Sequence, residues 1–186
     1  MWRNTADAYG LIQITLHWLI AILIAVLLPL GLWMTGLDYY DPWYKKAPDL
    51  HRAIGILFAL LLMLRMGWRL AQVQPRSLAA SAWEKRAAVA AHRLLYLLPL
   101  LLVVSGYLIS TADGRGIDVF GWFEVPATLQ GLEGQEDIAG DVHFALAMLL
   151  LAVITLHVLA ALRHHLVHKD DTLRRIWPGM DSARNR

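Results

Sequence analysis

The sequence predicts an all-α integral membrane protein, a single four-helix bundle with both termini in the cytoplasm. Three observations support this fold class. The 186 residues are 58% hydrophobic and 17% charged, with a mean hydropathy of +0.46, which is too apolar for a soluble domain of this size. Four stretches nearly free of charged side chains approach or exceed the roughly 20 residues that a spanning helix needs. Basic residues are concentrated on one side of these stretches, as they are in polytopic membrane proteins.

The expected spans follow from the charged residues that bound them. The first, third and fourth uncharged stretches contain about 30, 19 and 21 residues. The second contains only 12, and it reaches a membrane length if Arg65 and Arg69 extend to one surface. A buried re-entrant segment is the alternative for this stretch. We therefore expect spans at roughly residues 11–34, 51–71, 93–112 and 142–163, with a cytoplasmic tail over 164–186.

The segments outside the spans carry weaker signals. The first apolar run is too long for the core of a signal peptide, and no small-residue cleavage site follows it, so we expect an uncleaved first span. Residues 78–91 are expected to be helical and to extend the third span along the cytoplasmic surface. The long connection at 111–141 is rich in glycine and acidic residues, which predicts a loop. No repeat or second domain is evident, so residues 1–186 are taken as one domain.

Orientation follows from the basic residues. Thirteen of the 17 lysines and arginines fall in the N-terminal segment, the connection after the second span and the tail, whereas ten of the 15 acidic residues fall on the opposite side. The positive-inside rule then places both termini in the cytoplasm. Four crossings return the chain to its starting side, which agrees with this placement.

The absence of cysteine removes several kinds of site. The chain can form no disulfide, thiolate zinc site, iron–sulfur cluster on its own thiolates or covalent c-type haem. The net charge is only +2, and the basic residues flank apolar segments rather than forming a soluble basic face. We therefore expect no nucleic-acid partner, and any haem would be of the non-covalent b type.

Four histidines lie inside or at the ends of the apolar stretches: His17, His51, His143 and His157. An imidazole is costly to bury in hydrocarbon, so an intramembrane histidine is by default a functional residue. His143 and His157 are 14 residues apart, which is roughly 21 Å along one helix and nearly the same helix face. We predict two bis-histidine haems b, an outer one on His51 and His143 and an inner one on His17 and His157, with these four residues as the iron ligands. The ordinary alternative for any one of them is an interfacial imidazole bonded to a backbone carbonyl.

Neighbouring residues support this choice of ligands. A flat macrocycle needs small side chains one turn away, and the residues four positions after the four histidines are Ala21, Gly55, Ala147 and Ala161. The equivalent residue after His92 is Tyr96, which would crowd a porphyrin. We expect His92 to be a solvated interfacial residue, with quinone or proton handling as the alternative. Arg65 and Arg69 are expected to anchor the second helix, or else to neutralise the propionates of the inner haem.

Several short motifs in a fixed order resemble the bacterial cytochrome b561 family of di-haem membrane cytochromes. They are Ile-Thr-Leu-His-Trp at 14–18, His51 with Gly55, His-Arg-Leu-Leu-Tyr at 92–96 with Pro99 and Ser105-Gly106, His143 with His157, and His164-His165-Leu-Val-His-Lys-Asp-Asp-Thr-Leu at 164–173. The resemblance covers about residues 9–180. It implies a multi-pass protein of the bacterial inner membrane, with two haems b and the quinone pool as electron acceptor or donor. Superoxide oxidation coupled to ubiquinone reduction is one activity of this family, so the resemblance implies a quinone-linked oxidoreductase or electron carrier.

Donor and acceptor stay open at this point. Lys45, Lys46, Arg52 and Arg115 lie on the predicted outer side, where they could attract superoxide, so the donor is either a small molecule or a protein. A cytochrome b subunit that anchors a hydrogenase or dehydrogenase complex is the nearest alternative function. A haem-free transporter or structural bundle is the alternative from another class.

Overall fold

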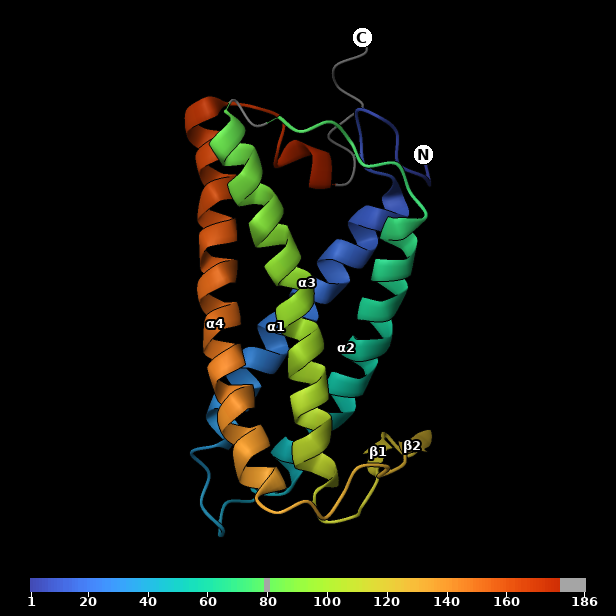
Figure 1. Ribbon diagram of the computed structural model, residues 1–186, viewed down its shortest axis with the longest axis vertical. Helices are drawn as coiled ribbons and strands as arrows, with labels where there is room; N and C mark the ends of the chain where they lie inside the picture. The colour runs from blue at the N-terminus through green and yellow to red at the C-terminus, as the bar shows by residue number, and fades with distance from the viewer. Residues whose placement is uncertain (79–80, 178–186) are drawn as a thin grey trace.

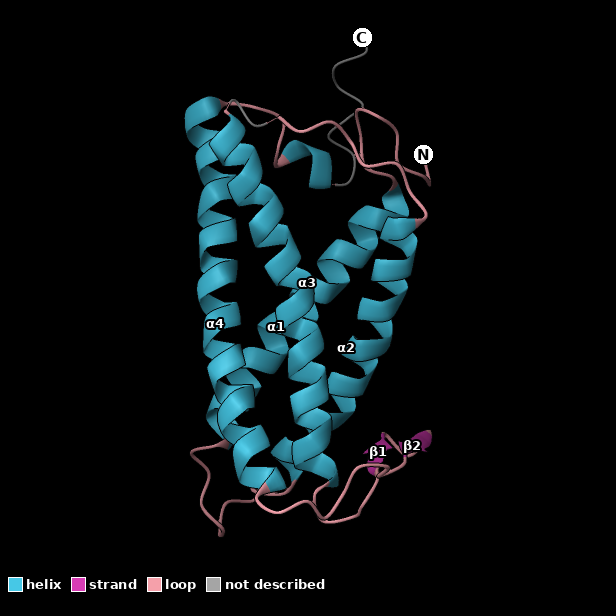
Figure 2. Cartoon of the chain, viewed as in Figure 1, coloured by secondary structure: helices cyan, strands magenta, loops and turns pink. Residues whose placement is uncertain are grey.

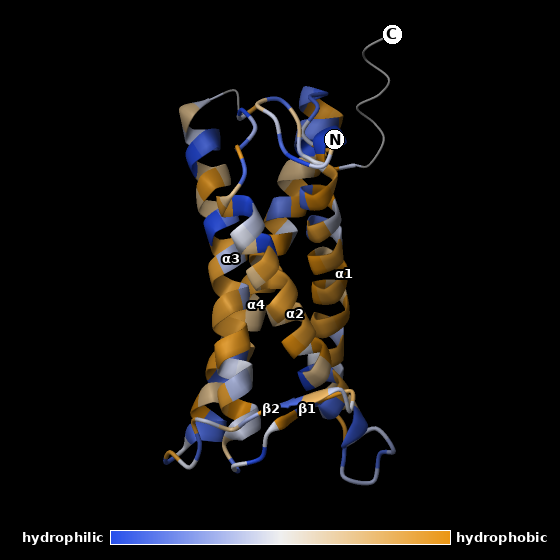
Figure 3. Cartoon of the chain, turned by 90° about the vertical axis from the view of Figure 1, so that its right-hand side faces the viewer, coloured by the Kyte–Doolittle hydropathy of each residue, from blue (hydrophilic) through white to orange (hydrophobic). Residues whose placement is uncertain are grey.

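The computed structural model describes residues 1–78 and 81–177 and contains four long helices packed side by side (Figures 1 and 2). Residues 79–80 of the expected 78–91 helix and residues 178–186 of the expected tail lie outside the described part. Hydrophobic residues occupy the middle of the helices and hydrophilic residues gather at both ends (Figure 3), which confirms the predicted integral membrane bundle. The helices are α1 (Leu11–Met34), α2 (Lys46–Leu70), α3 (Ala82–Thr111) and α4 (Gln135–Arg163).

Only the α1 boundaries match the expected span at both ends. The helix α2 begins five residues before the predicted residue 51, and its first turn contains Pro48 and Asp49, both of which suit a helix N-terminus. The α4 helix begins at Gln135, seven residues before the predicted start and inside the expected loop. Its first turn carries Glu136 and Asp137, whose charges favour the positive end of the helix dipole.

A capping box fixes the start of α3. The Ser81 hydroxyl accepts a hydrogen bond from the Glu84 backbone N–H at 3.3 Å, and a Glu84 carboxylate oxygen accepts one from the Ser81 N–H at 3.2 Å. From Ala82 onward, the expected surface helix and the expected third span are one continuous helix. The first three turns of α3 therefore extend beyond the span predicted from residue 93.

The bundle core consists of two helix pairs. Ile20 of α1 packs with Phe58 and Leu62 of α2, and Leu98 of α3 packs with Leu150 and Val153 of α4. Tyr96 and Val103 of α3 also pack against the first cluster, so the two pairs are joined across the bundle.

Residues 111–141 contain a hairpin where the sequence predicts a loop. Strands β1 (Ile117–Val119) and β2 (Phe123–Val125) pair antiparallel, with Ile117 opposite Val125. The side chains of Ile117 and Val119 are buried on one face of β1. Phe120 and Gly121 both have positive φ in the connecting turn, a conformation that hairpin turns favour and that glycine adopts easily. The alternation from Ile117 to Val119 before Gly121 was the available sequence signal.

The N-terminus, the start of α1 and the end of α4 lie at one end of the bundle, which we call the inner end; the opposite end, with the hairpin, is the outer end (Figure 1). The indole N–H of Trp18 donates to the Ile176 carbonyl at 2.8 Å, and the Trp18 and Trp177 rings meet edge to face with centroids 5.3 Å apart. The Asn4 amide donates to the Val73 carbonyl at 3.1 Å. The N-terminal segment, the α2–α3 connection and the C-terminal segment therefore cover the inner end together.

Replacing Gln135 by leucine is expected to lower the free energy of unfolding by about 1–3 kcal/mol, because it removes a buried amide that donates to two carbonyls, of which only that of Leu129 keeps another side-chain donor among the described residues, the Thr111 hydroxyl. The Gln135 amide is buried and donates to the carbonyls of Leu108 at 2.9 Å and Leu129 at 3.1 Å, which ties the outer loop to the end of α3. Thermal unfolding in detergent measures the effect. The same change at exposed Gln130 is the control, and equal effects at both positions would contradict this account.

Candidate functional site

At the outer end, His51 of α2 and His143 of α4 face one another. Their ring centroids are 6.3 Å apart and the ring planes are inclined by 74°. The structure thus places the two imidazoles of the predicted outer pair next to each other, and their role as iron ligands stays a prediction.

A cavity of about 520 Å³ surrounds this pair and is lined by all four helices. Gly55 and Ala147, the small residues predicted to make room for a macrocycle, both line it. Two further glycines let the imidazoles approach closely. A Cβ on Gly31 would lie 3.1 Å from Cε1 of His51, and a Cβ on Gly106 would lie 3.2 Å from Cε1 of His143.

The two imidazoles differ in their second partners. Nδ1 of His143 lies 3.0 Å from the hydroxyl oxygen of Ser105, which is buried and also bonds the Leu101 carbonyl at 2.9 Å. This contact fixes the orientation of the His143 ring, as the outer partners of metal-bound histidines do. Nδ1 of His51 is buried and lacks a hydrogen-bond partner among the described residues. A buried polar atom without a hydrogen-bond partner costs free energy, unless a bound ligand contacts the imidazole.

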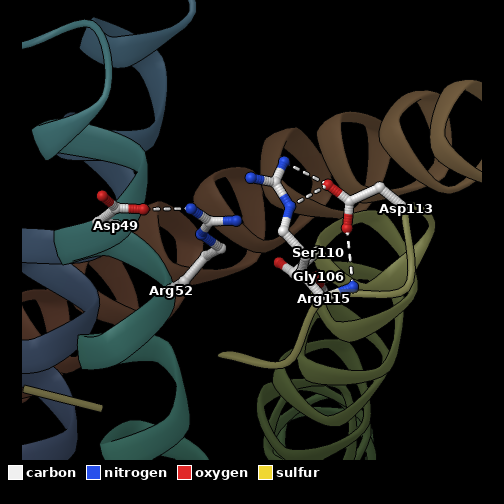
Figure 4. A network of polar contacts seen from close by, with 6 residues as sticks. All are labelled: Asp49, Arg52, Gly106, Ser110, Asp113 and Arg115. Carbon is white, nitrogen blue, oxygen red and sulfur yellow. Dashed lines mark hydrogen bonds and ion pairs between the residues drawn. The ribbon is translucent and has the colours of Figure 1, made fainter. Parts of the chain in front are cut away.

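Two ion pairs lie at the outer mouth of the cavity (Figure 4). Arg52 pairs with Asp49 on the same helix, and Arg115 pairs with Asp113 beyond the end of α3. The hydrogen bond from the Arg115 side chain lowers the pKa of the Asp113 carboxyl below its usual value. Two of the four cations predicted to attract superoxide are therefore offset by a carboxylate, which reduces their long-range field.

The inner end holds a second group of polar side chains. Arg65 belongs to α2, and its Nη2 lies 3.2 Å from Nδ1 of His17. Its Nε donates a hydrogen bond to the Tyr96 hydroxyl at 3.0 Å. The Arg69 guanidinium carbon lies 5.2 Å from the centroid of the same tyrosine ring. Arg65 is thus directed to the predicted inner ligand, whereas Arg69 lines a cavity on the flank of the bundle. The sequence alone does not distinguish these two arginines.

His92 belongs to this inner group. Its side chain is exposed, as expected, but its ring also meets the ring of His157 with centroids 5.5 Å apart. No ring contact joins His17 to His157 within residues 1–78 and 81–177. Three imidazoles therefore gather where an iron atom needs two. The predicted pairing of His17 with His157 stays a prediction.

The sequence of residues 8–179 matches the family described as prokaryotic cytochrome b561. The chain belongs to this family. It is 49% identical to Cytochrome b561 homolog 2 of Escherichia coli (strain K12) over 174 residues, which is 93% of each protein. It is 32% identical to the Probable superoxide oxidase CybB of Yersinia pestis, over 91% of this chain and 96% of the relative. Cytochrome b561 homolog 1 of Escherichia coli is 26% identical over 89% of this chain and 94% of its own.

Family membership makes this chain a bacterial multi-pass membrane protein of electron transfer, and it implies that the chain binds haem b. The residues at the outer end fit such a group. Two facing imidazoles, one with a buried unpartnered nitrogen, border a cavity whose walls carry glycine where the rings approach the helices. Four residues of this outer site, His51, Gly55, Gly106 and His143, are among those that carry the family resemblance.

Proposed function

We propose that the chain transfers electrons across the bacterial inner membrane between a donor and the quinone pool, using two haems b. The outer haem would be held by His51 and His143, and the inner one by His17 and His157. Both termini would lie in the cytoplasm, so the inner end of the bundle would face the cytoplasm. The concentration of basic residues at that end supports this orientation.

One observation carries the proposal: α4 contributes a histidine to a group of imidazoles at each end of the bundle. His143 meets His51 at the outer end, and His157 meets His92 at the inner end. The 14 residues between His143 and His157 correspond to roughly 21 Å along the helix axis. A single rigid helix would therefore fix the distance between two redox centres.

The side chains give each site a defined task. When bound, haem b supplies one-electron transfer between ferric and ferrous iron. Two histidines would hold each haem, one from α4 and one from another helix, and each haem would serve as a one-electron carrier. Ser105 holds His143 in one orientation through Nδ1. Arg65, next to His17, places a positive charge where it would offset the carboxylates of an inner haem.

Superoxide is the donor that we propose, with ubiquinone as the acceptor. In the balanced reaction, two superoxide anions are oxidised to two molecules of oxygen, while one quinone takes up two electrons and two protons to become a quinol. The relative from Yersinia pestis named as a probable superoxide oxidase supports this choice. Vesicles that contain the purified protein and ubiquinone should form quinol when superoxide is generated outside. Quinol formation that is unchanged when the protein is left out would contradict superoxide as the donor. Co-purification with a large redox subunit that supplies the electrons would favour the anchor-subunit alternative.

Haem stoichiometry tests the sites directly. The pyridine haemochrome of the purified protein should give two haems b per chain. His51→Ala and His143→Ala should each leave one haem with the same remaining spectrum, because both changes empty the same site. A colourless protein would contradict the proposal and would favour the haem-free bundle.

Ser105→Ala is expected to weaken retention of the outer haem by about 10–100-fold, the usual effect of losing an outer partner of a metal-bound histidine. Titration of apoprotein with haem measures the affinity, and a redox titration should show a shifted midpoint for one haem only. Thr155→Ala is the matched control, since the Thr155 hydroxyl bonds only the Leu151 carbonyl of its own helix and is exposed. If the affinity for the outer haem and its midpoint potential were unchanged in Ser105→Ala, the His143 ring would not need the contact with Ser105.

A further inference from the structure

A second cavity, of about 470 Å³, opens between α2 and α3 at the inner end. Arg69 of α2 and Arg93 of α3 line it, and Leu97 and Leu100 continue its wall toward the middle of the bundle. The Leu97 side chain is 49% exposed, so this wall faces the surroundings of the bundle rather than its core. Figure 1 shows α2 and α3 diverging toward this end. In a membrane, the cavity would open sideways into the lipid.

Within residues 1–78 and 81–177, neither of these two arginines has a carboxylate as a counter-charge. In the described part of the chain, the arginines in ion pairs are Arg52, Arg115, Arg163 and Arg174, and no carboxylate lies within ion-pair distance of Arg69 or Arg93. Tyr96 keeps Arg69 in place, because its hydroxyl is held by Arg65 and its ring lies beside the Arg69 guanidinium. Two unpaired guanidinium groups beside an apolar wall attract an anion from the membrane interface.

The polarity of the cavity changes along its length. Arginine lies at the end nearest the aqueous phase, and leucine lies about one to two turns farther into the membrane. A phospholipid has the same order, with a charged phosphate followed by an apolar chain. Basic pockets between membrane helices are known to bind such anionic headgroups. A free phosphate ion would use only the arginines and would leave the apolar wall uncovered.

We propose that this cavity binds one anionic phospholipid from the leaflet at the inner end. The phosphate would lie between Arg69 and Arg93, and an acyl chain would lie along Leu97 and Leu100. His92, whose ring meets that of His157, also lines this cavity, but none of the four proposed haem ligands does.

Native mass spectrometry of the haem-loaded protein tests the site, with phosphatidylglycerol and phosphatidylcholine as the probes. The wild-type protein should keep one phosphatidylglycerol under conditions that strip phosphatidylcholine. Arg69→Gln and Arg93→Gln should each weaken phosphatidylglycerol binding about fivefold, as expected for one basic residue at a headgroup, and the double variant about 25-fold. Arg86→Gln is the matched control, because Arg86 is an exposed arginine of α3 outside the cavity.

Further variants and a competing anion distinguish a phospholipid from the other possible ligands of this cavity. Arg69→Lys and Arg93→Lys keep the charge and should retain most of the binding, and thermal unfolding identifies any variant that has failed to fold. Displacement of the lipid by millimolar inorganic phosphate would overturn the proposal in favour of a simple anion site. Equal phosphatidylglycerol binding by the double variant and by Arg86→Gln would also overturn it. Recovery of ubiquinone instead of phospholipid, and its loss in Arg69→Gln, would assign the cavity to a quinone.

Discussion

Gly55→Leu is expected to remove the outer haem and leave the inner one, so that the haem content falls from two per chain to one. Gly55 lines the outer cavity, and a Cβ added there would meet no atom within 4 Å. A leucine side chain can therefore be accommodated by the polypeptide alone, but it would occupy the space that the macrocycle needs. Haemochrome stoichiometry and the loss of one of two midpoints in a redox titration measure the effect.

Gly67→Leu is the matched control for this change. Gly67 is also a glycine of α2 with open space around it, but it does not line the outer cavity. Both variants carry the same change in helix propensity and hydrophobicity. A difference in haem content between them therefore reflects the leucine side chain inside the outer cavity. Loss of haem from both variants, or from neither, would show that the cavity is not the haem site.

His157→Ala is expected to remove the inner haem, whereas His92→Ala should keep both haems. Both imidazoles lie at the inner end and their rings are in contact, so proximity alone does not distinguish them. Space favours His157 as the ligand, because Ala161 follows it by one turn, whereas Tyr96 follows His92. The Tyr96 hydroxyl is also held by Arg65, so this ring is not free to move aside. Haem stoichiometry with optical and electron paramagnetic resonance spectra of the low-spin haems measures the outcome.

His17→Ala completes this comparison. If His17 and His157 share one iron, the two alanine variants should lose the same low-spin signal and keep the same remaining one. Loss of that signal in His92→Ala with its retention in His17→Ala would instead pair His92 with His157. That result would agree with the ring contact and would correct the pairing predicted from depth along the helices.

The fold class was predictable because hydrophobic length and charge placement determine how many helices cross a membrane. The helix ends were less predictable. Charged residues such as Glu136 and Asp137 look like loop residues by composition, yet they begin α4 because acidic groups favour a helix N-terminus. The hairpin at β1 and β2 was not predicted, because each strand has only three residues and the alternation from Ile117 to Val119 is too short to distinguish a strand from a loop.

The histidine spacing on α4 could be read from the sequence alone, since a helix converts 14 residues into a fixed rise and rotation. The same logic predicted that His51 would lie level with His143, and the structure brings those two rings together. It could not predict the hydrogen bond between Ser105 and His143, the close approach of Gly31 to His51, or the contact of His92 with His157. These depend on how neighbouring helices are rotated and tilted against each other.

The amino-acid sequence by itself determined that this protein crosses the membrane four times and carries imidazoles at two depths. Both properties follow from local hydrophobicity and helix geometry, which need no knowledge of distant contacts. Only the tertiary structure decided which side chains meet: Arg65 against His17, Arg52 and Arg115 with carboxylates at the outer mouth, and Arg69 on the flank of the bundle. The physical reason is that side-chain partners are fixed by packing between helices, and many rotations of four apolar helices satisfy the same hydrophobic pattern.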